Sequence, residues 1–403
     1  MIKNHENNPE IALQAKPPLW SLNFIIVCLS NLNLFLVFNG LNATLPVYIE
    51  KFGGTTKIAG LAMTSLTVAA IMARPTTGWA LGKYGRRKLL VCGLVLFLIP
   101  SIIYIRMIPV ASLIALRFLQ GLGWGISHTA ISTVALDVIP QERMGEGLGF
   151  YSLFSSLSLA LSPAIALWLV SQYTFDRLFI ICTLLTLCTL IVSSFIRYPK
   201  VEMQASDHKL ELLKIADMWP SIVIFFMVFA NSSTISFLAL YTIDLGLTEK
   251  AAGLFFTTMA LTTLITRPLS GTIVDRIGQK GFDFCVMIGA VAIFIAVFFL
   301  VYTFQPVHLL IAGLLYGLCS GFFQAIMLVL AVRIVPPGKK SIANAIYWTA
   351  VDTGVALGSF SWGFVAYALG FKPMYGFTLI PVTVAILIYT MNRRKTKEKI
   401  ETA

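Results

Sequence analysis

One stretch of this sequence occurs twice, and the fold follows from the repetition. The first copy reads Arg74-Pro75-Thr76-Thr77-Gly78 and continues to Gly82-Lys83-Tyr84-Gly85-Arg86-Arg87. The second copy reads Arg267-Pro268-Leu269-Ser270-Gly271 and continues to Asp275-Arg276-Ile277-Gly278-Gln279-Lys280, a constant 193 residues later. Residues 45–85 align with residues 238–278 without a gap and match at 13 of 41 positions. The chain therefore consists of two copies of one half.

The composition excludes an ordinary soluble domain. Of the 403 residues, 57% are hydrophobic and only 12% are charged, which is typical of an integral membrane protein. A helix that crosses a bilayer needs ~20 apolar residues. Stretches of this kind lie near 20–46, 58–82, 89–108, 110–136, 145–171, 176–197, 219–242, 250–273, 283–303, 307–333, 341–368 and 373–391. The sequence therefore predicts an all-α fold with twelve transmembrane helices.

The predicted helices form two pseudo-symmetric six-helix bundles, at 20–197 and 219–391. A charged and partly amphipathic linker at 198–218 joins them, and it is interpreted as a tether or a short interfacial helix. The remaining segments are an N-terminal tail at 1–19 and a basic C-terminal tail at 392–403.

The distribution of basic residues predicts the orientation. Short basic loops are poorly translocated, so Lys and Arg concentrate on the cytoplasmic side. With both termini inside, 21 of the 30 basic residues lie in cytoplasmic segments and 6 outside. The protein is thus predicted to be a multi-pass protein of the cytoplasmic (inner) membrane of a prokaryote. This topology explains the net charge of +12, so no nucleic-acid partner is needed. The six cysteines all fall inside apolar stretches, which favours small core residues over disulfides or metal ligands.

In both copies an Arg-Pro pair on an apolar helix precedes a basic turn that contains glycine. This arrangement resembles the major facilitator superfamily, whose loop between helices 2 and 3 reads Gly-x-x-x-Asp-x-x-Gly-Arg-Arg or Lys and recurs between helices 8 and 9. The resemblance covers nearly the whole chain and implies alternating access around a site near the membrane midplane. It assigns a conformational role to the loop residues Gly78, Gly85, Arg86, Gly271, Asp275, Arg276 and Gly278.

The first loop departs from the family pattern at one position. Gly82 stands where the family has its Asp, whereas the second loop keeps Asp275. In the family this Asp is thought to brace the other half near a helix N-terminus, where its charge meets the helix dipole. We therefore predict an asymmetric lock, in which Asp275 braces the fifth helix and Gly82 cannot brace the eleventh.

Polar side chains within the predicted helices indicate candidate site residues. The first helix carries four asparagines, and the seventh carries a run of polar residues that begins at Asn231. Such residues are unfavourable in lipid, so they either line a shared central cavity or form hydrogen bonds between helices. The predicted cavity residues are Asn39, Asn231, Tyr316 and Gln324, with the aromatic residues Phe35, Phe38, Trp124 and Trp348.

The fourth helix reads Arg117-Phe118-Leu119-Gln120-Gly121-Leu122-Gly123 and resembles the helix 4 motif of proton-coupled antiporters in the superfamily. Arg117 has either a functional or a packing role. His128 lies eleven residues further, on the same face and ~16 Å deeper. It is either a site of proton transfer or a buried histidine with satisfied hydrogen bonds. The fifth helix keeps only Gly149 and Pro163 of the antiporter motif, so the export signature is incomplete.

Of the eighteen acidic residues, only Asp352 lies deep in a predicted crossing. A charged Asp at a helix centre costs ~2.5 to 3.5 kcal/mol unless it is paired, hydrated or protonated. Arg74 has a comparable predicted depth, and in the superfamily helices 2 and 11 lie against each other. We predict an ion pair between Arg74 and Asp352 that joins the halves and breaks when the carboxylate is protonated. The alternative is that Arg74 extends to the inner headgroups and Asp352 bonds Tyr or Thr neighbours.

These patterns predict a secondary transporter that exports a small amphipathic solute by proton antiport. The proton gradient supplies the energy and no cofactor is implied. The expected partners are the solute and the lipid bilayer, and the protein is expected to be a monomer. Uptake of a sugar or carboxylate by proton symport is the alternative, and a non-transporting receptor is a remote one. The sequence has no paired carboxylates, metal-ligand cluster or nucleophile with a base in register, and no filter sequence, which disfavours an enzyme or a channel.

Overall fold

The computed structural model describes residues 17–53, 56–106, 109–198, 217–247, 249–303 and 305–401. Within these ranges the chain is helical and has no strand. The first half holds α1 (Leu22–Lys51), α2 (Thr56–Tyr84), α3 (Arg86–Tyr104), α4 (Val110–Val138), η1 (Gln141–Arg143), α5 (Met144–Gln172) and α6 (Phe175–Ser193). The second half holds α7 (Trp219–Asp244), α8 (Glu249–Ile277), α9 (Gln279–Val301), α10 (Pro306–Arg333), η3 (Pro337–Lys339), α11 (Lys340–Leu369), α12 (Phe371–Phe377) and α13 (Leu379–Glu401).

The predicted twelfth crossing, 373–391, is built from two helices. α12 ends at Phe377 and α13 begins at Leu379. Pro381 explains the break, because it has no N–H to donate to the carbonyl of Phe377 and its ring clashes with that carbonyl. α13 also continues to Glu401, so the predicted C-terminal tail at 392–403 begins as helix. Most of the predicted linker 198–218, and residues 1–16 of the predicted N-terminal tail, lie outside the described residues.

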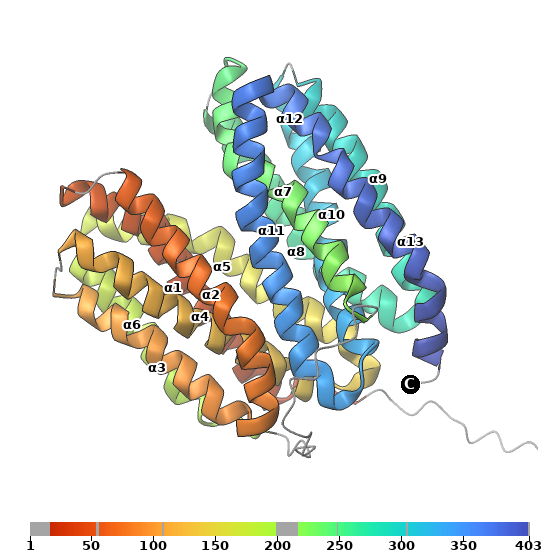
Figure 1. Ribbon diagram of the computed structural model, residues 1–403, viewed down its shortest axis with the longest axis horizontal. Coiled ribbons are helices and arrows are strands. Elements are labelled where there is room, and N and C mark those ends of the chain that lie inside the picture. Colours follow the sequence, from red (N-terminus) through yellow and green to blue (C-terminus); the bar gives the residue numbers. More distant parts are fainter. Residues whose placement is uncertain are drawn as a thin grey trace, which may run out of the picture.

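The two halves repeat the same packing. α1 packs on α5 and α2 on α4, just as α7 packs on α11 and α8 on α10. The bundles meet at one end, where α2 packs on α11 and α5 on α8, and they diverge toward the other end (Figure 1). We call the end where they meet the closed end. The repeated turns follow α2 and α8, and they contain Gly85 and Gly278, both of which have positive φ, a conformation that favours glycine.

Small residues bring the halves into backbone contact at the closed end. A Cβ added to Gly145 of α5 would lie only 2.5 Å from the carbonyl oxygen of Gly271 of α8. On the other side, a Cβ added to Gly78 of α2 would lie 2.6 Å from the Cβ of Ala345 of α11. The repeated glycines therefore serve as close-packing points, as small residues do between membrane helices.

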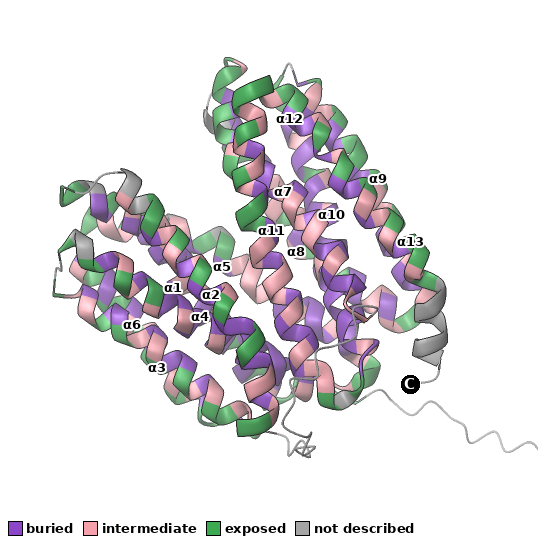
Figure 2. Cartoon of the chain, in the orientation of Figure 1, coloured by how far each residue is buried: buried purple, intermediate pink, exposed green. Residues whose placement is uncertain are grey.

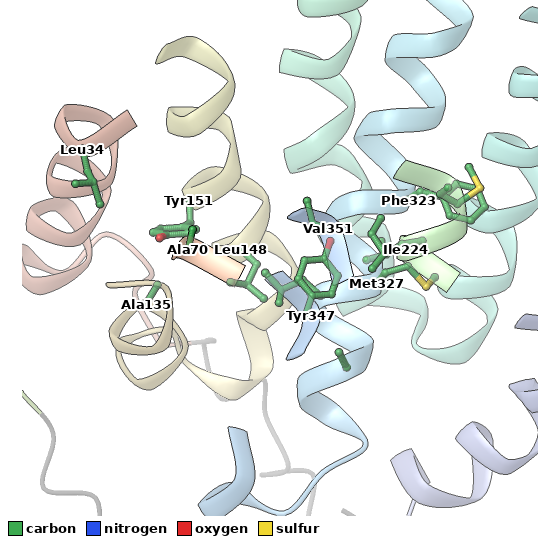
Figure 3. Close-up of a cluster of buried hydrophobic side chains, with 14 of the residues drawn as sticks. Leu34, Ala70, Ala135, Leu148, Tyr151, Ile224, Phe323, Met327, Tyr347 and Val351 are labelled. Carbon is green, nitrogen blue, oxygen red and sulfur yellow. The ribbon is translucent and has the colours of Figure 1, made fainter. Parts of the chain in front are cut away.

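Burial follows the expected pattern of a membrane bundle. Buried residues gather where helices face one another, and many exposed positions on the outer faces are large apolar side chains (Figure 2). One apolar cluster runs through both halves and includes Leu148 and Tyr151 of α5 and Tyr347 and Val351 of α11 (Figure 3). These side chains hold the halves together beside the polar contacts described below.

Eight spans among the described residues are long and apolar enough to cross a membrane, judged by length and composition. α2, α4, α8 and α11 are not among them. These four helices carry Arg74, Arg117, Arg267 and Asp352.

Candidate functional site

A cavity of about 700 Å³ lies between the two halves. α7, α8, α10 and α11 form most of its wall, and α1 and α5 contribute from the first half. Five of the predicted cavity residues line it, namely Asn39, Asn231, Tyr316, Gln324 and Trp348, together with the predicted aromatic Phe35. The Asn39 amide nitrogen, the Asn231 amide oxygen and the Trp348 indole nitrogen are buried without a partner. Their hydrogen-bonding capacity is not used within the described part of the chain.

Two predicted aromatic residues lie behind this wall rather than in it. Trp124 stacks on Phe38 with ring centroids 3.9 Å apart, and it stacks on His128 at 5.0 Å. Neither Trp124 nor Phe38 is among the lining residues. Their predicted role was wrong because helix-face periodicity places a residue toward the bundle interior without saying which neighbouring ring covers it.

An ion pair joins the two halves next to the cavity. The Arg74 Nε of α2 donates to Asp352 Oδ2 of α11 at 2.7 Å. Arg74 is 1% exposed, whereas the Asp352 side chain keeps 20% of its surface. The predicted contact between these residues is therefore present. A buried pair of this kind needs further hydrogen bonds to offset the loss of hydration.

His128 supplies one of those bonds. Its Nδ1 lies 3.0 Å from Arg74 Nη1, and Thr129 accepts a weaker bond from the same nitrogen at 3.4 Å. A guanidinium only donates, so the Nδ1 of His128 is the acceptor and the ring is neutral with its proton on Nε2. The ring also packs edge-on against Trp348 of α11 at 4.4 Å. His128 thus holds Arg74 in place from within the first half.

Arg117 belongs to a separate cluster. Its guanidinium donates to Gln120 Oε1 at 2.9 Å and to Asn42 Oδ1, and it contacts the Met63 sulfur at 3.1 Å. It is 1% exposed and does not line the cavity. The structure therefore does not bring Arg117 together with Asp352, and its contacts are those of a packing residue that ties three helices of the first half.

The two conformational loops differ as their sequences predict. Asp275 of α8 accepts hydrogen bonds from the backbone N–H groups of Gly145 at 2.9 Å and Glu146 at 2.7 Å, at the N-terminal end of α5. Arg333 of α10 donates to the same carboxylate at 2.7 Å. A Cβ added to Gly82 would meet nothing within 4 Å, so no brace reaches α11 from that position.

Two residues of the first loop have contacts within their own half or at the crossing. Arg86 donates to Asp137 Oδ2 of α4 at 2.9 Å and to the Leu81 carbonyl at 3.0 Å. Gly78 lies at the tight α2–α11 contact. In the second loop, Arg276 lies beside Asp275 in a small surface hollow with Arg143 and Glu146.

Two polar contacts between the halves were missed by sequence reasoning. Asn344 of α11 donates to Ser132 Oγ at 2.5 Å and to Thr133 Oγ1 at 3.1 Å on α4. Arg267 of α8 donates to the Ser152 carbonyl at 2.7 Å and to Ser156 Oγ at 2.5 Å on α5. Arg267 also lines the cavity. The signal for it was in the sequence, because Arg267 is the repeat counterpart of Arg74.

Comparisons with known proteins agree with this architecture. The sequence profile described as Major Facilitator Superfamily matches residues 27–359 and 220–403. An uncharacterized MFS-type transporter of Methanocaldococcus jannaschii is 22% identical over 91% of this chain and 97% of its own length. The staphylopine export protein of Staphylococcus aureus is 23% identical over 89% of this chain and 93% of its own length. The multi-drug resistance efflux pump PmrA of Streptococcus pneumoniae is 23% identical, with coverages of 85% and 89%.

Solved structures show the same fold. The fucose:proton symporter FucP of E. coli superimposes with a TM-score of 0.75 at 15% identity, over 94% of this chain and 99% of its own. A bacterial homologue of the iron transporter ferroportin, in an outward-facing state, superimposes with a TM-score of 0.71 at 17% identity, over 92% and 98%.

Proposed function

The chain belongs to the Major Facilitator Superfamily, and we propose that it exports a small organic solute across the cytoplasmic membrane in exchange for protons. The fold supports transport by alternating access, since a central cavity lies between two bundles that meet only at one end. A cavity of about 700 Å³ is of the size that holds a drug-sized ligand. The family consists of transporters, and an enzymatic function is not proposed.

The ion pair between Arg74 and Asp352 carries the proposal of proton coupling. It links α2 to α11 across the closed end, so it stabilises the state in which the cavity is shut off there. Protonation of Asp352 removes the negative charge and with it the attraction to Arg74. The pair then ceases to hold the closed end, and less free energy is needed to separate the two halves there. A proton is thereby converted into a change of access.

The proposed direction rests on orientation and on relatives. Under the predicted topology the closed end is cytoplasmic, so the cavity opens to the outside. Protons that reach Asp352 from outside would then drive the change to the inward-open state, and their release inside would permit the return with solute. Two relatives are named as exporters, the staphylopine export protein and a multi-drug efflux pump. Both names support efflux.

Uptake by proton symport is the second candidate. The helix α5 keeps only Gly149 and Pro163 of the antiporter motif, and a fucose:proton symporter shares the fold. Symport would use the same ion pair but would require the proton and the solute to bind together. The two functions differ in the direction of solute movement relative to the proton.

Proton flux in everted vesicles tests the proposal. Vesicles with an acidic lumen are challenged with neutral, anionic and cationic solutes, one at a time. We expect one solute class to release protons from the lumen, and Asp352→Asn to abolish that release. Asp244→Asn, at an exposed position at the end of α7, is the matched control and should behave like the wild type. Solute-driven proton release that persists in Asp352→Asn would contradict the coupling role, and solute accumulation in whole cells driven by inward proton flow would establish symport instead.

A further inference from the structure

The second arginine of the repeat lies in the cavity with no acidic partner. Arg267 is 8% exposed and is the one formally charged side chain among the described residues that line the cavity. Its terminal nitrogens donate to the Ser152 carbonyl, Ser156 Oγ and Gln324 Oε1, all of which are neutral. Its Nε has no partner. No ion pair to Arg267 is found in the described part of the chain.

The repeat shows which partner Arg267 lacks. Arg267 follows Arg74 by 193 residues, and a three-residue insertion before the tenth helix makes the offset 196 from there on, as Gly121 and Gly317 show. At that offset Gln324 corresponds to His128, and Asp352 corresponds to Ser156. Each arginine therefore has the same two neighbours by pseudo-symmetry, one from its own half and one from the other. In the first set the neighbour from the other half is an aspartate, whereas in the second it is a serine.

This difference leaves the second set short of one negative charge. A guanidinium remains charged in proteins, so burial cannot neutralise it by loss of a proton. A buried charge without a counter-charge is unfavourable, and neutral hydrogen bonds compensate only in part. The deficit faces a cavity rather than packed side chains.

We propose that Arg267 binds the anionic group of the transported solute, so that the solute supplies to Arg267 the negative charge that Asp352 supplies to Arg74. The inference rests on the proposed function, since the solute is taken to occupy this cavity. The guanidinium favours a planar oxyanion such as a carboxylate, which it can bind with two parallel hydrogen bonds. The rest of the wall is largely apolar and includes Phe35, Phe256 and Trp348. The substrate class is therefore an organic anion with an apolar body.

The partnerless polar groups of the cavity fit such a ligand. The amide nitrogen of Asn39 and the indole nitrogen of Trp348 are donors that a carboxylate or another acceptor can use. An organic cation, in contrast, would meet the buried charge of Arg267 without a compensating acid among the lining residues. A neutral polar solute would leave that charge uncompensated.

Equilibrium binding to the purified protein in detergent tests this inference without any proton gradient. The probes are three series of equal size and different charge: aryl carboxylates from benzoate to pyrene-1-carboxylate, their primary amides, and the matching arylmethylammonium ions. We expect the carboxylates to bind most tightly. Arg267→Gln should weaken their binding by about 30-fold, as loss of one member of a buried charge pair does.

Ser156→Asp provides a sharper variant, because it gives Arg267 a carboxylate at the position that corresponds to Asp352 beside Arg74. We expect it to keep or raise the melting temperature and to abolish carboxylate binding. Ser171→Asp adds the same charge to α5 at an exposed position and should change neither property. Amides or ammonium ions that bind as tightly as the carboxylates, carboxylate binding that survives Ser156→Asp, or no carboxylate binding to the wild type would overturn the inference.

The outcome is separable from that of the proposed function. Carboxylate binding that depends on Arg267, without proton release in vesicles, would sustain the substrate class and refute proton antiport. Proton release driven only by a cation or a neutral solute would sustain antiport and refute the substrate class.

Discussion

At the scale of single residues, His128 has one defined task in this structure. Its Nδ1 accepts a hydrogen bond from Arg74, so the ring serves as a hydrogen-bond acceptor and not as a group that carries a transported proton. The counterpart in the other half, Gln324, accepts from Arg267 through an amide oxygen. We therefore predict that His128→Gln retains transport at about the wild-type rate and retains its pH dependence. Solute-driven proton flux in vesicles provides the measurement.

The control for this prediction is His128→Leu, which removes the acceptor and leaves a donor of Arg74 without a partner. An unmade hydrogen bond to a buried charged group costs about 1 to 3 kcal/mol, so this variant should melt earlier and transport more slowly. If His128→Gln fails as badly as His128→Leu while remaining folded, His128 transfers protons itself.

The ion pair between Arg74 and Asp352 should be energetically coupled. Arg74→Met leaves the carboxylate of Asp352 without its counter-charge and should destabilise the protein by about 3 to 5 kcal/mol, as breakage of buried pairs does. Adding Asp352→Leu removes the unpaired negative charge, so the double variant should recover most of the stability that Arg74→Met loses. Thermal melting in detergent of the wild type, both single variants and the double variant measures the coupling.

Arg86→Met combined with Asp352→Leu is the comparison, because Arg86 pairs with Asp137 instead. Its effects should simply add. A fully additive result for Arg74 and Asp352 would mean that the pair contributes nothing to stability.

The contact between Arg74 and Asp352 could be predicted because each is a lone charge at a matching depth in a crossing, and such charges must find a partner. The contacts of Arg267 are harder to predict, because its partners are a backbone carbonyl, a serine and a glutamine, which leave no charge pattern in the sequence. Asn344 was missed for the same reason.

At the scale of helices, two helix pairs meet at the closed end, α5 with α8 and α2 with α11, and different interactions stabilise them. Asp275 of α8 accepts from two backbone N–H groups at the start of α5, where the helix dipole favours a negative charge. At the equivalent place on α2, Gly82 faces open space. The α2–α11 crossing therefore relies on the ion pair of Arg74 and on the hydrogen bonds of Asn344.

We predict that Gly82→Asp adds the missing brace and slows turnover. A carboxylate near the start of α11 should stabilise the closed end by about 0.3 to 1 kcal/mol, which corresponds to a two- to fivefold lower rate if opening of that end limits transport. Initial rates of solute-driven proton flux provide the measurement. Gly82→Asn has nearly the same size without the charge and should slow transport less. An unchanged or faster rate in Gly82→Asp would refute the asymmetric lock.

Helix positions were well predicted wherever apolar length alone decides them. The break between α12 and α13 was not predicted, although Pro381 marks it, because proline is tolerated inside other helices of this chain such as α2 and α8. Whether a proline kinks or divides a helix depends on its neighbours, since they decide whether the freed carbonyl finds another partner.

At the scale of the whole molecule, the doubled motif predicts two bundles but not the state in which they meet. A repeat fixes which helices correspond, whereas the relative tilt of the halves depends on a few contacts at their interface. Those contacts are concentrated at the closed end, in the glycine crossings, the Asp275 brace and the Arg74–Asp352 pair. The equilibrium between open states therefore depends on a small number of interactions, one of which is the ion pair that we propose a proton breaks.

The last prediction concerns this equilibrium directly. If protonation of Asp352 releases α11 from α2, acidification should populate a state in which the closed end is separated. Lys88 and Lys280 are exposed positions beside the repeated turns of the two halves. Spin labels at these positions report the separation as a distance measured by pulsed electron paramagnetic resonance. The exposed Cys92 and Cys188 are first changed to serine. We expect a longer distance to appear in the wild type as the pH falls and to be present at every pH in Asp352→Asn, because asparagine carries no charge. Asp244→Asn should respond like the wild type, and a distance distribution in Asp352→Asn that still shifts with pH would place the proton site elsewhere.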